Sequence, residues 1–276
     1  MRASHTRITR PTTGYPARTT FVRGLPSEPT STPRRKTNVL PLLTTATSAT
    51  EAARHARIAV VPIGSFEQHG AHLPLTTDTI IACSIGQRIA DAYRILLLPP
   101  VTISCSHEHE GFAGTVSVSA TTLTAIVQDI TASLARAGVL KIVLVNGHGG
   151  NHVLSNVVLE QNASARRMTL FPAREDWAMA RAHAEITTNG HDDMHGGELE
   201  TSMLLHLCPE LVSDCYTSAD HDANDRPYLL ISGIAGYTKT GIIGRPACAT
   251  AVKGRAVLES LVRSFGNHLK ILNELG

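Results

Sequence analysis

A carboxylate, an imidazole and a second carboxylate occur within twelve residues of the chain. They are Glu67, His69 and Asp78, in the segment 64–78. Glu67 and His69 are two residues apart, so in extended backbone their side chains point to the same side. Carboxylate oxygen and imidazole nitrogen together suit Zn²⁺, Mn²⁺ or Fe²⁺. The residue types alone also allow a surface loop in which Asp78 caps a helix.

A histidine between glycines follows the clearest strand pattern of the chain, 141–145. The stretch is Asn-Gly-His-Gly-Gly-Asn at 146–151, with His148 at its centre. Packing explains such a histidine poorly, whereas glycines let the backbone turn sharply and approach a ligand. A phosphate cradle at a helix N-terminus is the alternative. The stretch lacks the Walker lysine and the GxGxxG spacing that would favour it.

Histidines and acids also gather before and within a helical pattern at 198–207. The stretch contains His195, Glu198 and Glu200. Acids in a first helical turn also complement the helix dipole, so an ordinary structural role stays open for each glutamate. Three neighbouring residues are expected in a solvated loop: His191, Asp192 and Asp193.

A fourth stretch, 106–115, is rich in histidine and glutamate and follows a predicted strand. It overlaps the stretch 104–114, which is one expected substrate wall. His107 and His109 have ligand chemistry, but a rim that faces the substrate is the favoured interpretation. The other expected substrate wall is the loop-rich stretch 210–250. Trp177 fits a pocket wall and the core equally well.

These stretches are far apart in the sequence, so a fold must bring them together. From residue 58 on, strand patterns alternate with helical patterns. The predicted strands are 58–63, 95–98, 115–118, 141–145 and 168–171. The predicted helices are 80–89, 121–137, 153–165, 176–185, 198–207 and 254–272. Such alternation predicts an α/β fold with three layers, α/β/α, around a mostly parallel sheet. Ligands bind at the carboxyl ends of the strands in these folds.

The composition excludes several classes of protein. Residues 1–50 carry eight Lys/Arg and one acid, so the rest of the 276-residue chain has a net charge of −5. No basic stripe that would bind nucleic acid lies within the fold. No apolar run reaches the roughly 20 residues that span a bilayer. Five cysteines without a CxxC pair predict free thiols in a reducing cytoplasm.

The first 45 residues differ from the rest. They are rich in Arg, Thr, Pro and Ser without periodicity, which predicts a disordered basic extension at 1–45 and one domain at 46–276. A targeting segment or a partner-binding arm is the alternative for the extension.

Three of the stretches together resemble the signatures of the creatininase (creatinine amidohydrolase) family. They are Gly-Ser-Phe-Glu-Gln-His-Gly-x-His-Leu-Pro-Leu-x-x-Asp at 64–78, the glycine-rich stretch 146–151, and His-Gly-Gly-Glu-x-Glu-Thr-Ser at 195–202. The resemblance covers about residues 55–260. It implies two divalent metal ions per chain, with Zn²⁺ the favoured metal and Mn²⁺ or Fe²⁺ the alternatives. It also implies an assembly of identical chains, which is commonly a hexamer in this family.

The resemblance also implies roles for individual residues. Glu67 and His69 would each bind one ion, Asp78 would bridge both, and His148 would bind the ion of Glu67. Creatininase has a further carboxylate two residues after its counterpart of His148, where this chain has Gly150.

The missing carboxylate leaves one ligand to be found. Glu198 is the first candidate for that ligand and Glu200 the second. His195, with whichever glutamate is not a ligand, would transfer protons.

The implied reaction is amide hydrolysis by a hydroxide that bridges the two metals. Its substrate is a small amide: a creatinine-like cyclic amide, a formamide on a purine or pyrimidine precursor, or a short peptide bond, as in the mycofactocin peptidase of the family. The replacement of a carboxylate by Gly150 argues against creatinine itself. A non-catalytic metal-binding or ligand-binding protein and a phosphate- or nucleotide-binding protein are the alternatives from other classes.

Overall fold

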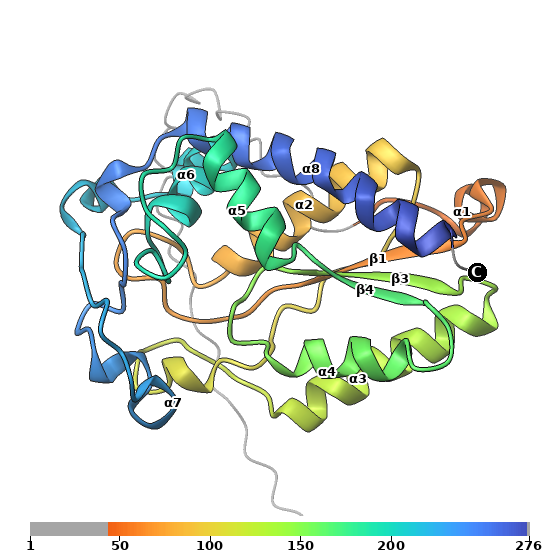
Figure 1. Cartoon of the computed structure of the whole chain (residues 1–276), viewed down its shortest axis with the longest axis horizontal. Coiled ribbons are helices and arrows are strands. Elements are labelled where there is room, and N and C mark those ends of the chain that lie inside the picture. The colour runs from red at the N-terminus through yellow and green to blue at the C-terminus, as the bar shows by residue number, and fades with distance from the viewer. Residues whose placement is uncertain (1–43, 275–276) are drawn as a thin grey trace, which may run out of the picture. The chain divides into compact units, whose positions relative to one another are not determined.

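A parallel sheet of four strands forms the centre of the fold (Figure 1). The computed structural model describes residues 44–274. The strands are β1 (Ile58–Ile63), β2 (Leu96–Leu97), β3 (Lys141–Asn146) and β4 (Met168–Phe171). Their order across the sheet is β2-β1-β3-β4, and each neighbouring pair is parallel. The predicted α/β class with a parallel sheet is therefore confirmed.

Helices cover both faces of this sheet (Figure 1). On one face lie α2 (Thr77–Tyr93), α5 (Arg174–His183), α6 (Glu198–Leu207) and α8 (Ala251–Glu274). On the other lie α3 (Ala120–Arg136) and α4 (Val153–Gln161). The shorter helices and turns are α1 (Ser48–Arg54), η1 (His107–His109), η2 (Pro209–Leu211), η3 (Asp214–Ser218), α7 (Leu229–Ser232), η4 (Ile234–Gly236) and η5 (Pro246–Cys248).

The alternation of side chains along β1 builds two separate cores. Val60 packs into the core that α2, α6 and α8 cover, with Ile85 and Phe265. Its neighbour Val61 packs into the core that α3 and α4 cover, with Leu123. All of these side chains are almost completely buried. A strand buried on both faces needs the unbroken apolar run that the sequence of β1 supplies.

The register of β1 and β3 brings their carboxyl ends to the same level. Ile63 pairs with Asn146, and the backbone N–H of Gly147 donates to the carbonyl of Ile63 at 2.8 Å. A Cβ at Gly64 would lie 2.4 Å from the backbone of Thr79, and one at Gly147 would lie 2.3 Å from the carbonyl oxygen of Asp78. Glycine at both positions lets the two strand ends and the start of α2 pack in direct contact.

Three local predictions were wrong. Residues 115–118 form no strand, and only Val116 makes a β-bridge, to Phe66. The neighbouring Thr115 and Ser117 instead accept hydrogen bonds through their hydroxyls from backbone N–H groups of other loops. The N-cap of α2 is Thr76, and Asp78 lies inside the helix. Asp193 is buried and accepts hydrogen bonds from the first backbone N–H groups of α6.

The remaining expectations concern segments outside the sheet. Residues 210–250 contain only short helical turns, as predicted. Trp177 is half-buried and packs against the core between the sheet and α8. Among the described residues, no helix combines the length and apolar character needed to cross a membrane. The extension predicted at 1–45 lies almost wholly outside the described residues.

Candidate metal centre

In the described part of the chain, three groups of side chains that could hold a metal ion meet at the carboxyl ends of β1 and β3, and two of these groups share Asp78. The first comprises Glu67, Asp78 and His148, all buried. Nδ1 of His148 lies 3.1 Å from Oε1 of Glu67 and 3.1 Å from Oδ2 of Asp78. These residues come from the loop after β1, the first turn of α2 and the loop after β3, which the glycine contacts described above hold together.

The second group shares Asp78 with the first. Nε2 of His69 lies 3.1 Å from Oδ1 of Asp78 and 3.9 Å from Oε2 of Glu200. In each group the three ligand atoms lie within 4.8 Å of one another. The two oxygens of Asp78 are thus divided between the groups, with Oδ1 beside His69 and Oδ2 beside His148. A carboxylate that faces two clusters in this way has the arrangement of a bridging ligand.

Two carboxylate oxygens at the centre have no hydrogen-bond donor among the described residues: Oε1 of Glu67 and Oδ2 of Asp78. The other carboxylate oxygen of Glu67 does accept a hydrogen bond, from the hydroxyl of Ser65 at 2.8 Å. A buried carboxylate oxygen without a partner is costly, and both orphan oxygens face the same ring nitrogen of His148. Residues and geometry therefore fit a divalent cation.

The histidines of the two groups are oriented by backbone carbonyls. Nδ1 of His69 donates to the carbonyl oxygen of Glu67 at 3.1 Å. Nε2 of His148 donates to the carbonyl oxygen of Cys105 at 2.9 Å. The second nitrogen of each ring then faces carboxylates. This is the usual support of a histidine that ligates a metal, because the outer hydrogen bond fixes the orientation of the ring.

The charges at this centre are strongly coupled. Burial lowers the pKa of His69, but the carboxylate of Asp78 outweighs burial and raises that pKa to about 9. Burial likewise lowers the pKa of His148, and the carboxylates of Glu67 and Asp78 raise it well above the ordinary value. Burial raises the pKa of Glu200 to about 7. Without a metal, protons therefore occupy the positions that a cation would take.

The structure separates the two glutamates of α6. Glu200 joins the second group, whereas Nζ of Lys253 donates to Glu198 at 2.5 Å. Thr187 and Thr188 also donate to Glu198 through backbone N–H groups and hydroxyls. Glu198, which was expected to supply the remaining ligand, belongs to none of the groups of described residues that could hold an ion, and its carboxylate is bonded to Lys253 and the two threonines instead.

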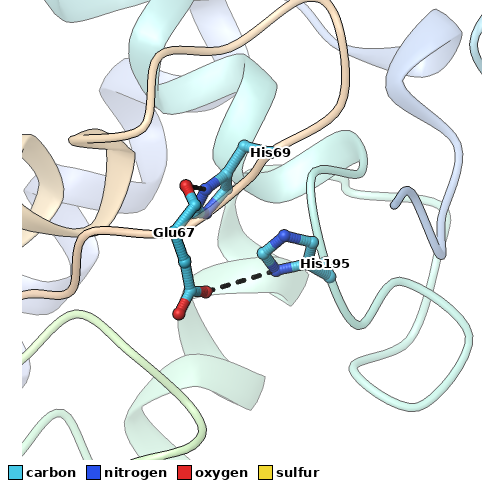
Figure 2. A group of neighbouring side chains, drawn as sticks. All are labelled: Glu67, His69 and His195. Atoms are coloured by element: carbon cyan, nitrogen blue, oxygen red, sulfur yellow. Dashed lines mark hydrogen bonds and ion pairs between the residues drawn. The ribbon is translucent and has the colours of Figure 1, made fainter. Parts of the chain in front are cut away.

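His195 lies between the two groups, with Glu67 and His69 (Figure 2). Its Nε2 donates to the carbonyl oxygen of Gln68 at 2.6 Å, so Nδ1 faces Oε1 of Glu67 at 3.8 Å. Burial lowers the pKa of His195 well below the ordinary value, and the neighbouring His69 and His109 rings add to the effect. A neutral ring whose free nitrogen faces the centre is able to accept a proton.

The prediction that both histidines of the stretch 104–114 form a rim was wrong for His109. His109 is buried, with Nε2 3.3 Å from Oε1 of Glu67, and its ring centroid lies 4.3 Å from that of His195. His107 stays exposed and bonds Ser117. Nothing in the residue types distinguishes the two histidines, since the turn η1 and its contacts decide which one points inward.

Glu108 occupies the space beside Gly150. Its Oε1 lies 3.2 Å from Nε2 of His148, on the side of the ring away from the cluster. A Cβ at Gly150 would lie 1.7 Å from that oxygen and 2.4 Å from Nε2 of His148. A side chain at Gly150 is therefore incompatible with the present positions of both neighbours.

This crowding makes Gly150→Ala a specific test of the His148 position. We expect the variant to bind Zn²⁺ about 10–100-fold more weakly, because the added methyl group displaces the ring and the carboxylate that supports it. Titration against a chromophoric chelator measures the change. The matched control is Gly149→Ala, where a Cβ would meet nothing within 4 Å. Equal affinity in both variants and the wild type would contradict the assignment.

The chain resembles proteins of known activity over most of its length. Residues 43–269 match the family model Creatininase, described as creatinine amidohydrolase. The mycofactocin precursor peptide peptidase of Mycobacterium ulcerans (strain Agy99) is 35% identical over 216 residues, which cover 74% of this chain and 80% of the relative. The creatinine amidohydrolase of Pseudomonas putida is 29% identical over 234 residues, covering 77% and 88%.

Solved structures agree with these matches. A crystal structure of creatinine amidohydrolase superimposes with a TM-score of 0.71 at 27% identity, covering 82% of this chain and 95% of that one. Two more creatininase structures match with TM-scores of 0.70 and 0.67, at 26% and 27% identity, and cover 82% and 81% of this chain and 96% and 93% of their own. The first is described as the Mn form and the second as a mutant of Zn-Zn type.

Proposed function

The chain belongs to the creatininase family, and from this premise we propose that it is a metal-dependent amidohydrolase that cleaves a carbon–nitrogen bond. The observation that carries the proposal is Asp78, whose two oxygens serve two groups of ligand atoms. Glu67 and His148 would hold one divalent ion with Asp78, and His69 and Glu200 would hold the other. Zn²⁺ and Mn²⁺ both suit carboxylate and imidazole ligands.

The chemistry that two such ions supply when bound is a water of lowered pKa and polarisation of the amide carbonyl. The residues of the chain then handle the protons. Attack of water oxygen on the carbonyl carbon forms a C–O bond, and Nδ1 of His195 is placed to take the proton released. When the C–N bond breaks, the same nitrogen returns this proton to the leaving amine. Glu200, first considered for proton transfer, is assigned here to the ligands.

The substrate class we favour is a peptide bond rather than a cyclic amide. The identity to the mycofactocin precursor peptide peptidase is 35%, against 29% to the creatinine amidohydrolase. Gly150 also removes the carboxylate that distinguishes creatininase. A location in the cytoplasm and an assembly of identical chains stay predictions from the sequence.

The test is a hydrolysis assay of the protein loaded with Zn²⁺ or Mn²⁺, with a panel of short peptides, formamides and cyclic amides. Release of an amine from a peptide, abolished by a chelator and restored by the metal, is the expected result. Two bound ions with no turnover of any panel member would instead indicate the non-catalytic metal-binding alternative. Turnover that survives metal removal would contradict the proposed mechanism.

Metal uptake should depend on pH, because cations and protons compete for the same atoms. His69, with a pKa of about 9, and His148 are both protonated in the metal-free protein at neutral pH. Metal binding must therefore release protons, and the apparent affinity should rise from about pH 6 to about pH 9 as the rings deprotonate. Calorimetry in buffers of different ionisation enthalpy counts the protons. An affinity that stays constant over this range would contradict the assignment of these two histidines.

A further inference from the structure

Gln68 stands between two proposed ligands, Glu67 and His69, but its side chain turns away from the metal groups. It is buried and makes three hydrogen bonds. Its Oε1 accepts from the backbone N–H of Gly70 at 2.9 Å. Its Nε2 donates to the carbonyl oxygen of Gly241 at 3.1 Å and lies 2.9 Å from Nδ1 of His109.

These partners fix the orientation of the amide. A backbone N–H of Gly70 needs an acceptor, and a carbonyl of Gly241 needs a donor, so oxygen and nitrogen of the Gln68 side chain cannot be exchanged. Nε2 of Gln68 must then donate to Nδ1 of His109. That nitrogen is an acceptor, and the proton of the neutral ring sits on Nε2, which faces Oε1 of Glu67 at 3.3 Å.

The backbone carbonyl of Gln68 fixes the tautomer of a second histidine, His195, so that its unprotonated nitrogen faces the centre. This carbonyl oxygen accepts from Nε2 of His195 at 2.6 Å, which leaves a lone pair on Nδ1 toward the centre. His69 and His148 each donate a hydrogen bond from one ring N–H to a backbone carbonyl oxygen. Among the four histidines of the centre, only His109 presents an N–H to it once metal binding has displaced the protons of His69 and His148.

We propose that Gln68 is a positioning residue that sets two histidines to opposite roles: His109 turns an N–H toward the ligand carboxylate of Glu67, and His195 turns a nitrogen that can accept a proton toward the centre. The effect on catalysis rests on the proposed function. The tautomers of the two histidines follow only from hydrogen bonds within the chain. The N–H of His109, whose nitrogen lies 3.3 Å from Oε1 of Glu67, then stabilises the negative charge of this ligand carboxylate. It cannot serve as a metal ligand itself, because its inward nitrogen carries the proton.

The experiment reads the protonation of each ring nitrogen directly. Protein labelled with ¹⁵N-histidine is studied by NMR at about pH 8, zinc-free and zinc-loaded, with resonances assigned through His109→Gln and His195→Gln. The wild type should show the proton on Nε2 in both His109 and His195. A proton on Nδ1 of His109 in the wild type would overturn the proposal without any variant.

The variant Gln68→Glu separates the effect of the Gln68 side chain on His109 from the effect of its backbone carbonyl on His195. An ionised carboxylate cannot donate, so His109 should move its proton to Nδ1. His195 should stay unchanged, since its partner is the backbone carbonyl of residue 68. Zinc affinity should fall about 10–100-fold with the loss of the N–H that faces Glu67. The matched control is Gln128→Glu, at an exposed site of α3, which should change neither ring.

The outcomes distinguish this proposal from the function on which it rests. A His109 tautomer that stays the same in Gln68→Glu overturns the positioning role. The expected tautomers in a protein that hydrolyses nothing would support the positioning role while the proposed function fails. Expected tautomers together with an unchanged zinc affinity would overturn the support of Glu67 by His109.

Discussion

Replacement of Asp78 by alanine is expected to remove both metal ions and to reduce kcat/KM by at least about 10⁴-fold, since the metal centre would supply most of an enhancement that typically exceeds 10⁶. Asp78 belongs to both proposed ligand groups, the one with Glu67 and His148 and the one with His69 and Glu200. Its Oδ1 faces His69 and its Oδ2 faces His148, both at 3.1 Å. No neighbouring side chain can supply two oxygens at this point, so neither ion keeps a full set of ligands.

Elemental analysis of the purified variant measures the effect, alongside circular dichroism as a test of folding. Asp91→Ala is the matched control, because Asp91 lies on the exposed side of the same helix, α2. The control should retain two ions per chain and full activity. An Asp78→Ala protein that retains two ions would show that Asp78 does not bridge them.

The second large effect is a difference between the two glutamates of α6. Glu200→Gln is expected to lose about one ion per chain and most activity, because a neutral amide is a poor ligand for a divalent cation beside His69. Glu198→Gln is expected to retain both ions. Its cost falls on stability, by about 1–3 kcal/mol, because it weakens charged hydrogen bonds to Lys253 and the threonines.

Each of these variants is the control for the other, since both remove one negative charge from the first turn of the same helix. Metal content and thermal unfolding of the two proteins side by side decide between them. Loss of an ion from Glu198→Gln, with both ions retained in Glu200→Gln, would restore the assignment that the sequence alone suggested.

The choice between these glutamates shows where prediction from the sequence ends. Residues two apart in a helix point roughly 200° apart, from 3.6 residues per turn. Glu198 and Glu200 therefore lie on opposite faces, one toward Lys253 of α8 and the other toward His69. A sequence places both in the first turn but does not say which face meets the centre, since the packing of α6 against α8 decides this.

Other parts of the site followed from simple rules. The apolar runs of β1 and β3 predicted two strands of a parallel sheet, and the carboxyl ends of such strands lie at one edge of the sheet. The structure adds that these two strands are neighbours. This is why Glu67, His69 and His148 lie close together. His109 escaped the same reasoning, because its inward position depends on the turn η1 and on Gln68 from a distant part of the chain.

The proposed centre holds two metal ions, with His148 as a ligand of one and His69 as a ligand of the other. The most direct measurement is the metal content per chain of the wild type and of His148→Ala, by elemental analysis of protein loaded with Zn²⁺ and freed of excess. We expect close to two ions in the wild type and about one in the variant. A wild type that binds no Zn²⁺ or Mn²⁺, or a variant that still holds two ions, would contradict the account.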